Sequence, residues 1–183
     1  MRRTIFRTLS LAPYQLVGSG LALLALLAGL PVAAARDKRA EPPLIERVTQ
    51  MPGPVVPGVM VEVREVLEGR ESPTHVVQTA IEAALLKQDI TVLDSGKPQF
   101  VVYGSSDTRY TDEKDAFGQA VHFCQTVVTL KVTQVEGGKV LATITETARE
   151  GGTEPMRAAV ASLDTAAHAA AQKVLEALKG KVK

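Results

Sequence analysis

The segment from Ala120 to Val135 restricts the fold more than any other part of the chain. Its side chains alternate between two faces, as they do in a β-strand that is buried on one side. Gly137-Gly138 is typical of a tight turn, and Val140 to Thr145 then predicts the return strand of an antiparallel hairpin. The face that we expect to be buried holds Ala120, His122, Cys124, Thr126, Val128, Leu130 and Val132.

A strand, a helix and two short strands are predicted before this hairpin. Val59, Val61 and Val63 alternate with more polar residues, which indicates a half-buried strand. Ser72-Pro73 favours a helix start, because serine caps the first turn and proline fits its first position. The predicted elements are the strand Val59–Val66, a helix from Pro73 to about Lys87 with Val77, Ile81, Ala84, Leu85 and Gln88 on one face, and the strands Ile90–Leu93 and Phe100–Tyr103, the last ended by Gly104.

An alanine-rich helix is predicted from about Glu154 to Leu178, after Gly151-Gly152 has broken the sheet. Its apolar residues recur in steps of three and four, a spacing that places them on one helical face. The predicted stripe is Met156, Val160, Leu163, Ala167, Ala170, Val174 and Ala177, and we expect Val160, Leu163, Ala167, Ala170 and Val174 to be buried against the sheet.

These elements predict an α+β fold, with two helices packed on a single, mostly antiparallel or mixed sheet in the order β-α-β-β-β-β-α. The single cysteine, Cys124, cannot form an internal disulfide, so the domain depends on its core. The chain has no Trp and few other aromatic residues, and the core must therefore be built from Val, Leu, Ile and Ala.

The N-terminal 35 residues have the pattern of a secretory signal peptide. Arg2, Arg3 and Arg7 precede a charge-free stretch whose strongly apolar part is Leu21–Leu30, and Ala33-Ala34-Ala35 supplies the small residues of a cleavage site. We expect cleavage after Ala35 and a periplasmic or secreted protein. The alternative is a retained anchor in the inner membrane that faces the periplasm, the only case in which this chain would contact a membrane. No Cys stands directly after the apolar run to receive a lipid.

Residues 36–57 are predicted to be a linker, and residues 58–183 to be the domain. Five of the ten prolines lie between Pro42 and Pro57, and proline favours extended backbone. Within the linker, Leu44 to Val48 has two open alternatives, a single helical turn or a segment docked on the domain. Loss of residues 1–35 changes the net charge from +1 (21 − 20) to −2 (18 − 20), which gives the chain no electrostatic attraction for nucleic acid.

The order of the local patterns resembles a group of bacterial envelope modules. The pieces that carry the resemblance are a helix followed by a short strand, Ile81 to Leu93; the segment Pro98 to Gly104, similar to a "DxVVxG" strand; the hairpin Val128 to Ala142; and a final "A-x-x-x-A" helix. This order is similar to the amino-terminal domain of TolB, the curli-secretion assembly protein, flagellar assembly protein T and the lipoprotein activators of penicillin-binding proteins. Gln99 stands where that pattern usually has Asp. The resemblance implies a non-catalytic module used in envelope assembly or regulation.

His122 and Cys124 are weak candidates for a metal site, since both side chains point to one face of the same strand. Two ligands do not make a structural zinc site, and His75 and His168 lie on separate predicted helices. Cys124 as a nucleophile would need a base and an orienting group, and His122 is the only local base. Buried packing is therefore the preferred interpretation of both residues, and no cofactor is predicted.

The segment Ser105 to Gly118 is predicted to be a polar insertion at the tip of a hairpin. Its acids do not have the spacing of a calcium-binding loop, so we interpret it as a solvated tip. Tyr110 and Phe117 are costly to expose there, which makes them the predicted contacts with a protein partner. The acids are Asp107, Asp112, Glu113 and Asp115.

The chain carries no motif of a hydrolase, a nucleotide-binding loop or a paired-cysteine metal site. We therefore expect an exported, non-enzymatic protein that binds another component of the bacterial cell envelope. The alternative is a periplasmic protein that binds a small ligand or a metal.

Overall fold

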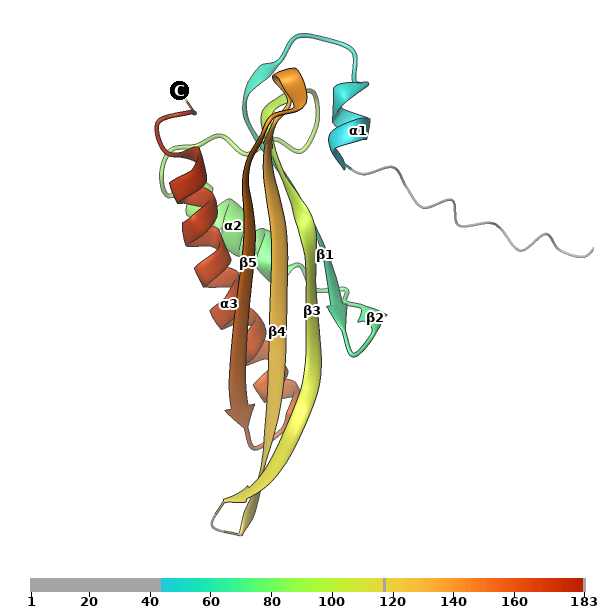
Figure 1. The fold of residues 1–183 in the computed structure, drawn as a ribbon, viewed down its shortest axis with the longest axis vertical. Helices are drawn as coiled ribbons and strands as arrows, with labels where there is room; N and C mark the ends of the chain where they lie inside the picture. The colour runs from blue at the N-terminus through green and yellow to red at the C-terminus, as the bar shows by residue number, and fades with distance from the viewer. Residues whose placement is uncertain (1–43, 117, 183) are drawn as a thin grey trace, which may run out of the picture. The chain divides into compact units, whose positions relative to one another are not determined.

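A computed structural model describes residues 44–116 and 118–182 (Figure 1). The predicted signal segment and Phe117 lie outside these described residues. Within them, no helix is both long and apolar enough to span a membrane. The elements in chain order are α1 (Leu44–Thr49), β1 (Val56–Leu67), β2 (Arg70–Glu71), α2 (Val76–Leu86), β3 (Pro98–Ala116), β4 (Gln119–Gln134), the short 3-10 turn η1 (Glu136–Gly138), β5 (Val140–Gly152) and α3 (Pro155–Leu178).

The strands form one five-stranded mixed sheet in the order β2-β1-β3-β4-β5. β1 and β3 pair in parallel through the α2 crossover, and the other neighbours are antiparallel. The diglycine turn lies at η1, between β4 and β5, as predicted. The predicted α+β class with a mixed sheet is confirmed.

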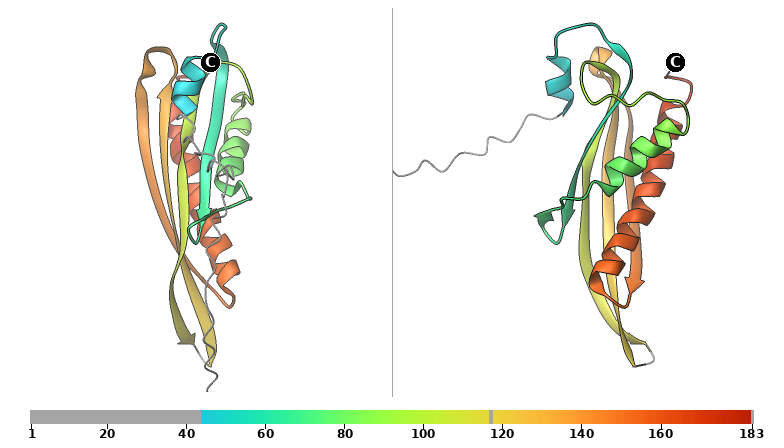
Figure 2. Two further views of the ribbon diagram at one scale, coloured as in Figure 1. Left: turned by 90° about the vertical axis from the view of Figure 1, so that its right-hand side faces the viewer. Right: turned by 180° about the vertical axis from the view of Figure 1, so that it is seen from behind.

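Helices cover the two faces of the sheet unequally. α2 and α3 lie side by side on one face (Figure 2), where Val77, Ile81 and Val174 are fully buried. α1 packs on the opposite face, where Leu44 and Val48 form a separate cluster with Met60, Val101 and Val135. Leu44 to Val48 therefore satisfies both alternatives, because it forms the short helix α1 and is docked on the domain.

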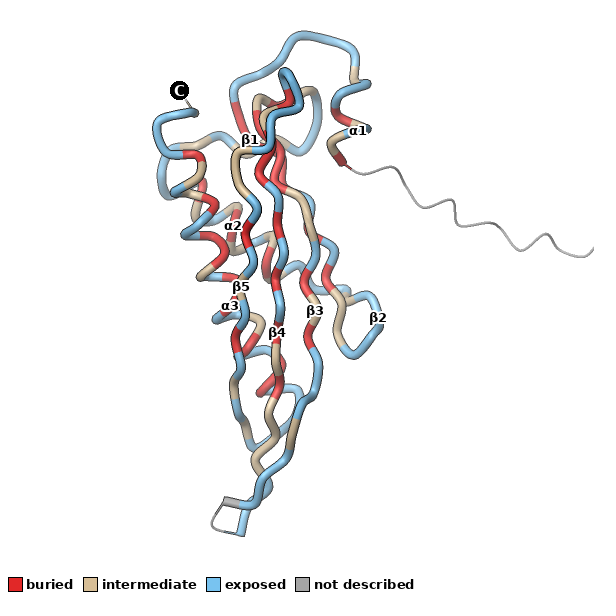
Figure 3. The backbone as a smooth tube through the Cα atoms, in the orientation of Figure 1, coloured by how far each residue is buried: buried red, intermediate tan, exposed pale blue. Residues whose placement is uncertain are grey.

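The core is aliphatic because alternate residues of each central strand face α2 and α3. Val59, Val61 and Val63 on β1 are buried in this way, as are Val128, Leu130 and Val132 on β4. Full burial of each such side chain contributes about 1.5–3 kcal/mol. Buried positions alternate with exposed ones along β4 and become rare toward the far end of β3 and β4 (Figure 3).

The predicted stripe of α3 is correct in its C-terminal half and wrong at its start. Ala167, Ala170 and Val174 are buried, and Leu163 is half-buried. Met156 and Val160, however, are 60% and 54% exposed. The face that meets the sheet here is made of small residues, because only they let the helix approach β4 closely. These residues are Ala158, Ala159, Ser162 and Ala166.

α2 begins at Val76 and not at Pro73, because its cap comes from another element. The Glu65 carboxylate on β1 accepts hydrogen bonds from the first N–H groups of the helix, and Ser72 instead hydrogen-bonds Thr74. The predicted face is confirmed at Val77, Ile81 and Leu85; Ala84 is half-buried and Gln88 is exposed beyond the helix end.

Residues 105–116 of the predicted insertion Ser105 to Gly118 form the second half of β3. Its residues pair with β4 from Ser105↔Thr129 to Ala116↔Gln119, with a register shift between Tyr110 and Asp112. Thr108 in this half is buried and hydrogen-bonds Thr126, which in turn hydrogen-bonds Ser162 on α3. From Arg109 to Asp115 the residues of β3 are exposed or half-buried. Ile90 to Leu93, predicted to be a strand, makes only an isolated bridge, Val59↔Val92.

Two glycine predictions are also corrected. Gly104 does not end the strand: it is paired with Leu130, and a Cβ there would overlap the Thr129 carbonyl oxygen. Gly151-Gly152 does not break the sheet but forms the end of β5, paired with Phe123 and His122. A Cβ on Gly151 would lie 2.9 Å from the Phe123 ring, so glycine makes room for that aromatic side chain.

Candidate partner-binding groove

The β-bulge at Thr111 brings together residues that strict alternation would separate. Before the bulge Tyr110 lies opposite Cys124, and after it Glu113 lies opposite His122. The extra residue changes the parity of β3, because a bulge places two residues opposite one. Tyr110 and Glu113 therefore share the face of the sheet that carries His122 and Cys124.

Three of these side chains interact directly. The Tyr110 hydroxyl donates to Glu113 Oε2 over 3.2 Å, and His122 Nδ1 lies 3.3 Å from the same oxygen. The Tyr110 and His122 rings are tilted against each other with centroids 6.0 Å apart. Glu113 thus contacts both Tyr110, a predicted partner contact, and His122, one of the two metal candidates.

A groove of about 390 Å³ opens over this cluster, between the end of β1 and the start of α3. We call it the hairpin groove, defined by Glu68, Tyr110, Glu113, His122, Cys124 and Met156, with Leu67, Pro155 and Ala159 completing its walls. Tyr110 is 41% exposed and Met156 60%, so two large side chains meet solvent at its rim. The groove lies on strands and a helix and not on a flexible loop.

Cys124 is a packed thiol at the base of the hairpin groove. It is buried, and its Sγ donates a weak hydrogen bond to the Pro155 carbonyl over 3.5 Å. Burial raises the pKa of the Cys124 thiol, and the negative charge of Glu68 raises it further. A raised pKa leaves the neutral thiol dominant near pH 7, and the neutral thiol is not the nucleophilic form.

The described residues offer no assembled metal site. Within residues 44–116 and 118–182, no three His, Cys, Asp or Glu side chains converge in a way that could hold an ion. The acids of the segment that was predicted to be an insertion have separate partners. Asp107 pairs with Arg109, and Asp112 lies within ion-pair distance of Lys114 and Arg149.

Desolvation raises the pKa of Tyr110, and its hydrogen bond to Glu113 raises it further, so the hydroxyl keeps its proton at neutral pH. The backbone N–H of Tyr110 donates to the Glu68 carboxylate.

The role of Tyr110 in partner contact stays a prediction, and Phe117 lies outside the described residues. Sequence patterns did not identify Glu68 or Met156 as residues that line a binding site. Met156 lies in the first turn of α3, directly after Pro155 at the helix start, and this position could have set it apart from the rest of the apolar stripe.

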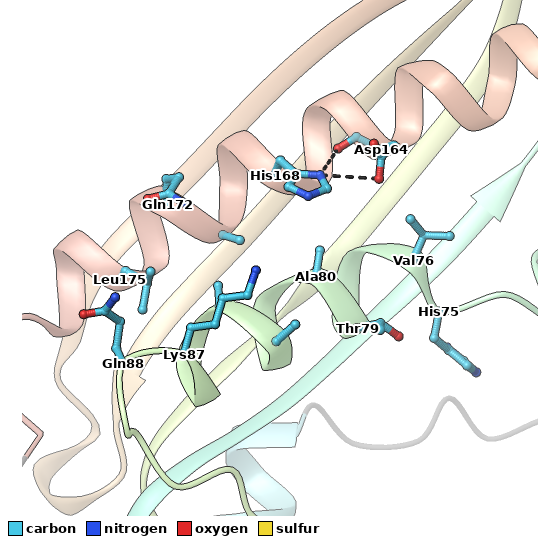
Figure 4. A pocket seen from close by; sticks show the side chains of 13 residues that line it. His75, Val76, Thr79, Ala80, Lys87, Gln88, Asp164, His168, Gln172 and Leu175 are labelled. Carbon is cyan, nitrogen blue, oxygen red and sulfur yellow. Dashed lines mark hydrogen bonds and ion pairs between the residues drawn. The ribbon is translucent and has the colours of Figure 1, made fainter.

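A second concavity, the interhelical groove, runs between α2 and α3 and has a volume of about 520 Å³. Its floor is made of small residues such as Ala80 and Ala84. Lys87 reaches into it, whereas His75 points away from α3 (Figure 4). His168 Nδ1 lies 2.9 Å from the Asp164 carbonyl oxygen and 3.4 Å from its carboxylate. His75 and His168 therefore do not converge in the interhelical groove.

No protein-family model matches the chain, and no curated protein matches it in sequence. Solved structures do resemble it. A minor lipoprotein from Acinetobacter baumannii is 12% identical with a TM-score of 0.47, over 68% of this chain and 94% of that one. The rare lipoprotein B from Shewanella oneidensis is 11% identical with a TM-score of 0.42, over 67% and 95%. A PelC dodecamer from Paraburkholderia phytofirmans is 21% identical with a TM-score of 0.37, over 70% and 94%.

All three similar proteins come from bacteria, and two are named as lipoproteins. None of the three bears the name of TolB, the curli-secretion assembly protein, flagellar assembly protein T or the activators of penicillin-binding proteins. At these TM-scores, function has to be argued from the residues of this chain.

Proposed function

We propose that this chain is an exported, non-enzymatic protein of the bacterial cell envelope that binds another envelope protein through the hairpin groove. The observation that carries the proposal is the exposure of Tyr110 and Met156 around a groove with a buried base. The signal-peptide pattern supplies the compartment. The neutral Cys124 thiol and the missing catalytic motifs favour binding over chemistry.

The two rim residues suit protein recognition for different reasons. Tyrosine offers a large apolar ring with a polar end, and it is enriched among residues that dominate binding energy. Methionine is flexible and polarisable, so it adapts to the shape of an incoming side chain. Both are held by regular structure, which keeps the groove formed before a partner arrives.

Site-specific photo-crosslinking in the intact envelope tests this proposal. A photoreactive amino acid replaces Tyr110 or Met156 in the full chain, and the control position is Val140, which is 51% exposed on β5. We expect protein adducts from positions 110 and 156 and none of the same size from position 140. Exported, folded protein that forms no adduct at either groove position would disprove the proposal.

The second candidate function is small-ligand binding in the interhelical groove. Its alanine floor and the Lys87 ammonium group would accept a molecule with an apolar body and an anionic group. Native mass spectrometry of protein purified from the envelope should then find a bound small molecule that a Lys87→Glu variant loses. Detection of the ligand-free protein alone would exclude this candidate. The same measurement with added zinc tests whether His122 and Cys124 bind a metal.

A further inference from the structure

β3 extends well beyond the end of β1, its parallel neighbour in the sheet. The parallel ladder of β1 and β3 ends at Leu67↔Thr108, whereas β3 pairs with β4 as far as Ala116↔Gln119. Over residues 109–116, β3 has β4 on one side and no described strand on the other. The track that β1 follows in the sheet is therefore vacant there, and we call this space the vacant lane.

Glu68 closes β1 at the entrance to the vacant lane. Its N–H donates to the Thr108 carbonyl oxygen over 2.9 Å, which makes the last rung of the ladder. The chain then turns away at Glu68, whose φ of 50° is left-handed. The Glu68 carboxylate accepts the Tyr110 N–H, so a side chain satisfies a donor that points into the lane.

The hairpin groove lies along the helix side of this lane. Side chains of a strand alternate between its two faces, so every second side chain of a strand in the lane would point toward the groove. There it would meet Tyr110, Cys124 and Met156, which offer apolar surface. The vacant lane and the groove are thus one surface, with backbone on one side and a side-chain pocket beside it.

The charge of this surface selects a cationic occupant. Among the described residues that line the groove, the formally charged ones are Glu68 and Glu113, both carboxylates. Arg109, on the same edge, is paired with Asp107 through Nε and Oδ2 at 2.9 Å. Charged side chains and a bulge protect an open edge from indiscriminate pairing. A strand that supplies Lys or Arg against these carboxylates overcomes that protection.

Building on the proposed function, we propose that the partner contributes an extended segment that adds to β3 in the vacant lane, with an aliphatic side chain in the hairpin groove and a Lys or Arg facing Glu68 and Glu113. Main-chain pairing gives such strand addition its affinity, and pockets for alternate side chains give it specificity. The same carboxylates disfavour an acidic segment.

A random library of displayed twelve-residue peptides tests the inference without knowledge of the partner. The mature chain is the bait. We expect selected peptides to contain Lys or Arg near an aliphatic residue in an extended, proline-free stretch. Selection of acidic peptides, of helical amphipathic peptides, or of none above background would overturn the inference.

Matched variants locate the binding. Met156→Asp should weaken a selected peptide by about tenfold or more, equivalent to about 1.4 kcal/mol. Val160→Asp, a similarly exposed apolar residue one helical turn away, should stay within about twofold of wild type. Glu113→Lys should also weaken binding, whereas Glu176→Lys makes the same charge change at the far end of α3 and should not. Equal effects within either pair would overturn the assignment to the groove.

Amide hydrogen exchange separates strand addition from binding in the groove alone. A bound peptide should slow exchange within residues 110–116, and sedimentation should show a monomer without it. Protection confined to α2 and α3 would contradict strand addition, because the peptide would then bind the helices. A dimer that the peptide dissociates would mean that a second copy of this chain occupies the vacant lane. Crosslinks from positions 110 and 156 combined with failed peptide selection would leave the proposed function standing and reject only the strand.

Discussion

The Glu65 carboxylate on β1 accepts a hydrogen bond from the Val77 backbone N–H on α2, over 2.8 Å. The N–H of Val76 donates to its other oxygen over 3.0 Å, and Glu65 itself is 3% exposed. A carboxylate at this position also complements the positive end of the helix dipole. One side chain thus joins the parallel crossover helix to the strand that precedes it.

Replacing Glu65 should destabilise the domain more than replacing any exposed glutamate. Glu65→Ala removes the acceptor for buried N–H groups, which costs about 1–3 kcal/mol. Urea unfolding followed by circular dichroism measures the change. Glu71→Ala is the control, because Glu71 is exposed on β2. A Glu65 variant as stable as the Glu71 variant would show that water replaces the carboxylate at no cost.

Ala167 should tolerate no large side chain. It is fully buried where α3 meets the sheet, so Ala167→Phe should overpack the interface and cost about 1–3 kcal/mol. Val160→Phe on the exposed side of the same helix should change stability by less than about 0.5 kcal/mol. Thermal unfolding compares the two, and an unchanged melting temperature for Ala167→Phe would contradict the packing described here.

Cys124 should alkylate slowly in the native protein, and faster at high pH or in urea. Its folded pKa is raised, so the native state favours the neutral thiol. The stability that this preference contributes is present below the ordinary pKa of a thiol and is lost as pH rises through the raised one. Iodoacetamide modification against pH, read by mass spectrometry, measures the effect. A native rate equal to the unfolded rate at pH 7 would contradict it.

The far end of the β3–β4 hairpin should be dispensable for folding. Replacing residues 114–121 by Asn-Gly keeps the pair Glu113↔His122 and closes it with a favoured two-residue turn. The described side chains among the removed residues are exposed or half-buried, so we expect the shortened protein to fold with a cooperative transition. Loss of that transition would mean that the hairpin end stabilises the core.

Export should leave a mature chain that begins at Arg36. The pattern of Arg2, Leu21–Leu30 and Ala33-Ala34-Ala35 predicts a cleaved signal peptide. Intact mass of the protein from the periplasmic fraction measures this directly. A mass that includes residues 1–35, with the protein in the membrane fraction, would favour the retained anchor.

Elements with a strong local period were predictable from the sequence. The alternation of β4 gave the correct buried face from Cys124 to Val132, and the spacing of α3 gave it in the C-terminal half of the helix. Ala120, predicted on the same face of β4, is exposed and His122 is half-buried, because the core ends before them. β3 was cut short at Gly104 because its outer half is polar. Thr108 is buried there because it hydrogen-bonds Thr126, and residues 109–115 are exposed or half-buried while they pair with β4. Local patterns do not distinguish such a polar strand from a loop.

The candidate groove was less predictable, because it depends on contacts between distant segments. The sequence singles out Tyr110 as a partner contact and, separately, His122 and Cys124 as a pair of metal candidates. The bulge at Thr111 is what brings Glu113 into register with all three residues. Met156 was placed on the apolar stripe of α3 and Val160 was expected to be buried, yet both are exposed. Helical spacing identifies an apolar stripe without showing how closely the helix approaches the sheet. Glu65 lies 12 residues before Val77, and no local motif connects a strand carboxylate to a later helix cap.

The parallel pairing of β1 with β3 has a consequence for the order in which the chain acquires structure. Val59 pairs with Phe100, 41 positions later (100 − 59), so β1 leaves the ribosome well before its partner exists. Until then, Val59, Val61 and Val63 form an apolar face with nothing to cover it, the condition under which chains aggregate. β3, β4 and β5 instead join neighbours through short turns. β1 is therefore the strand of this domain whose long pairing partner is made latest after the strand itself.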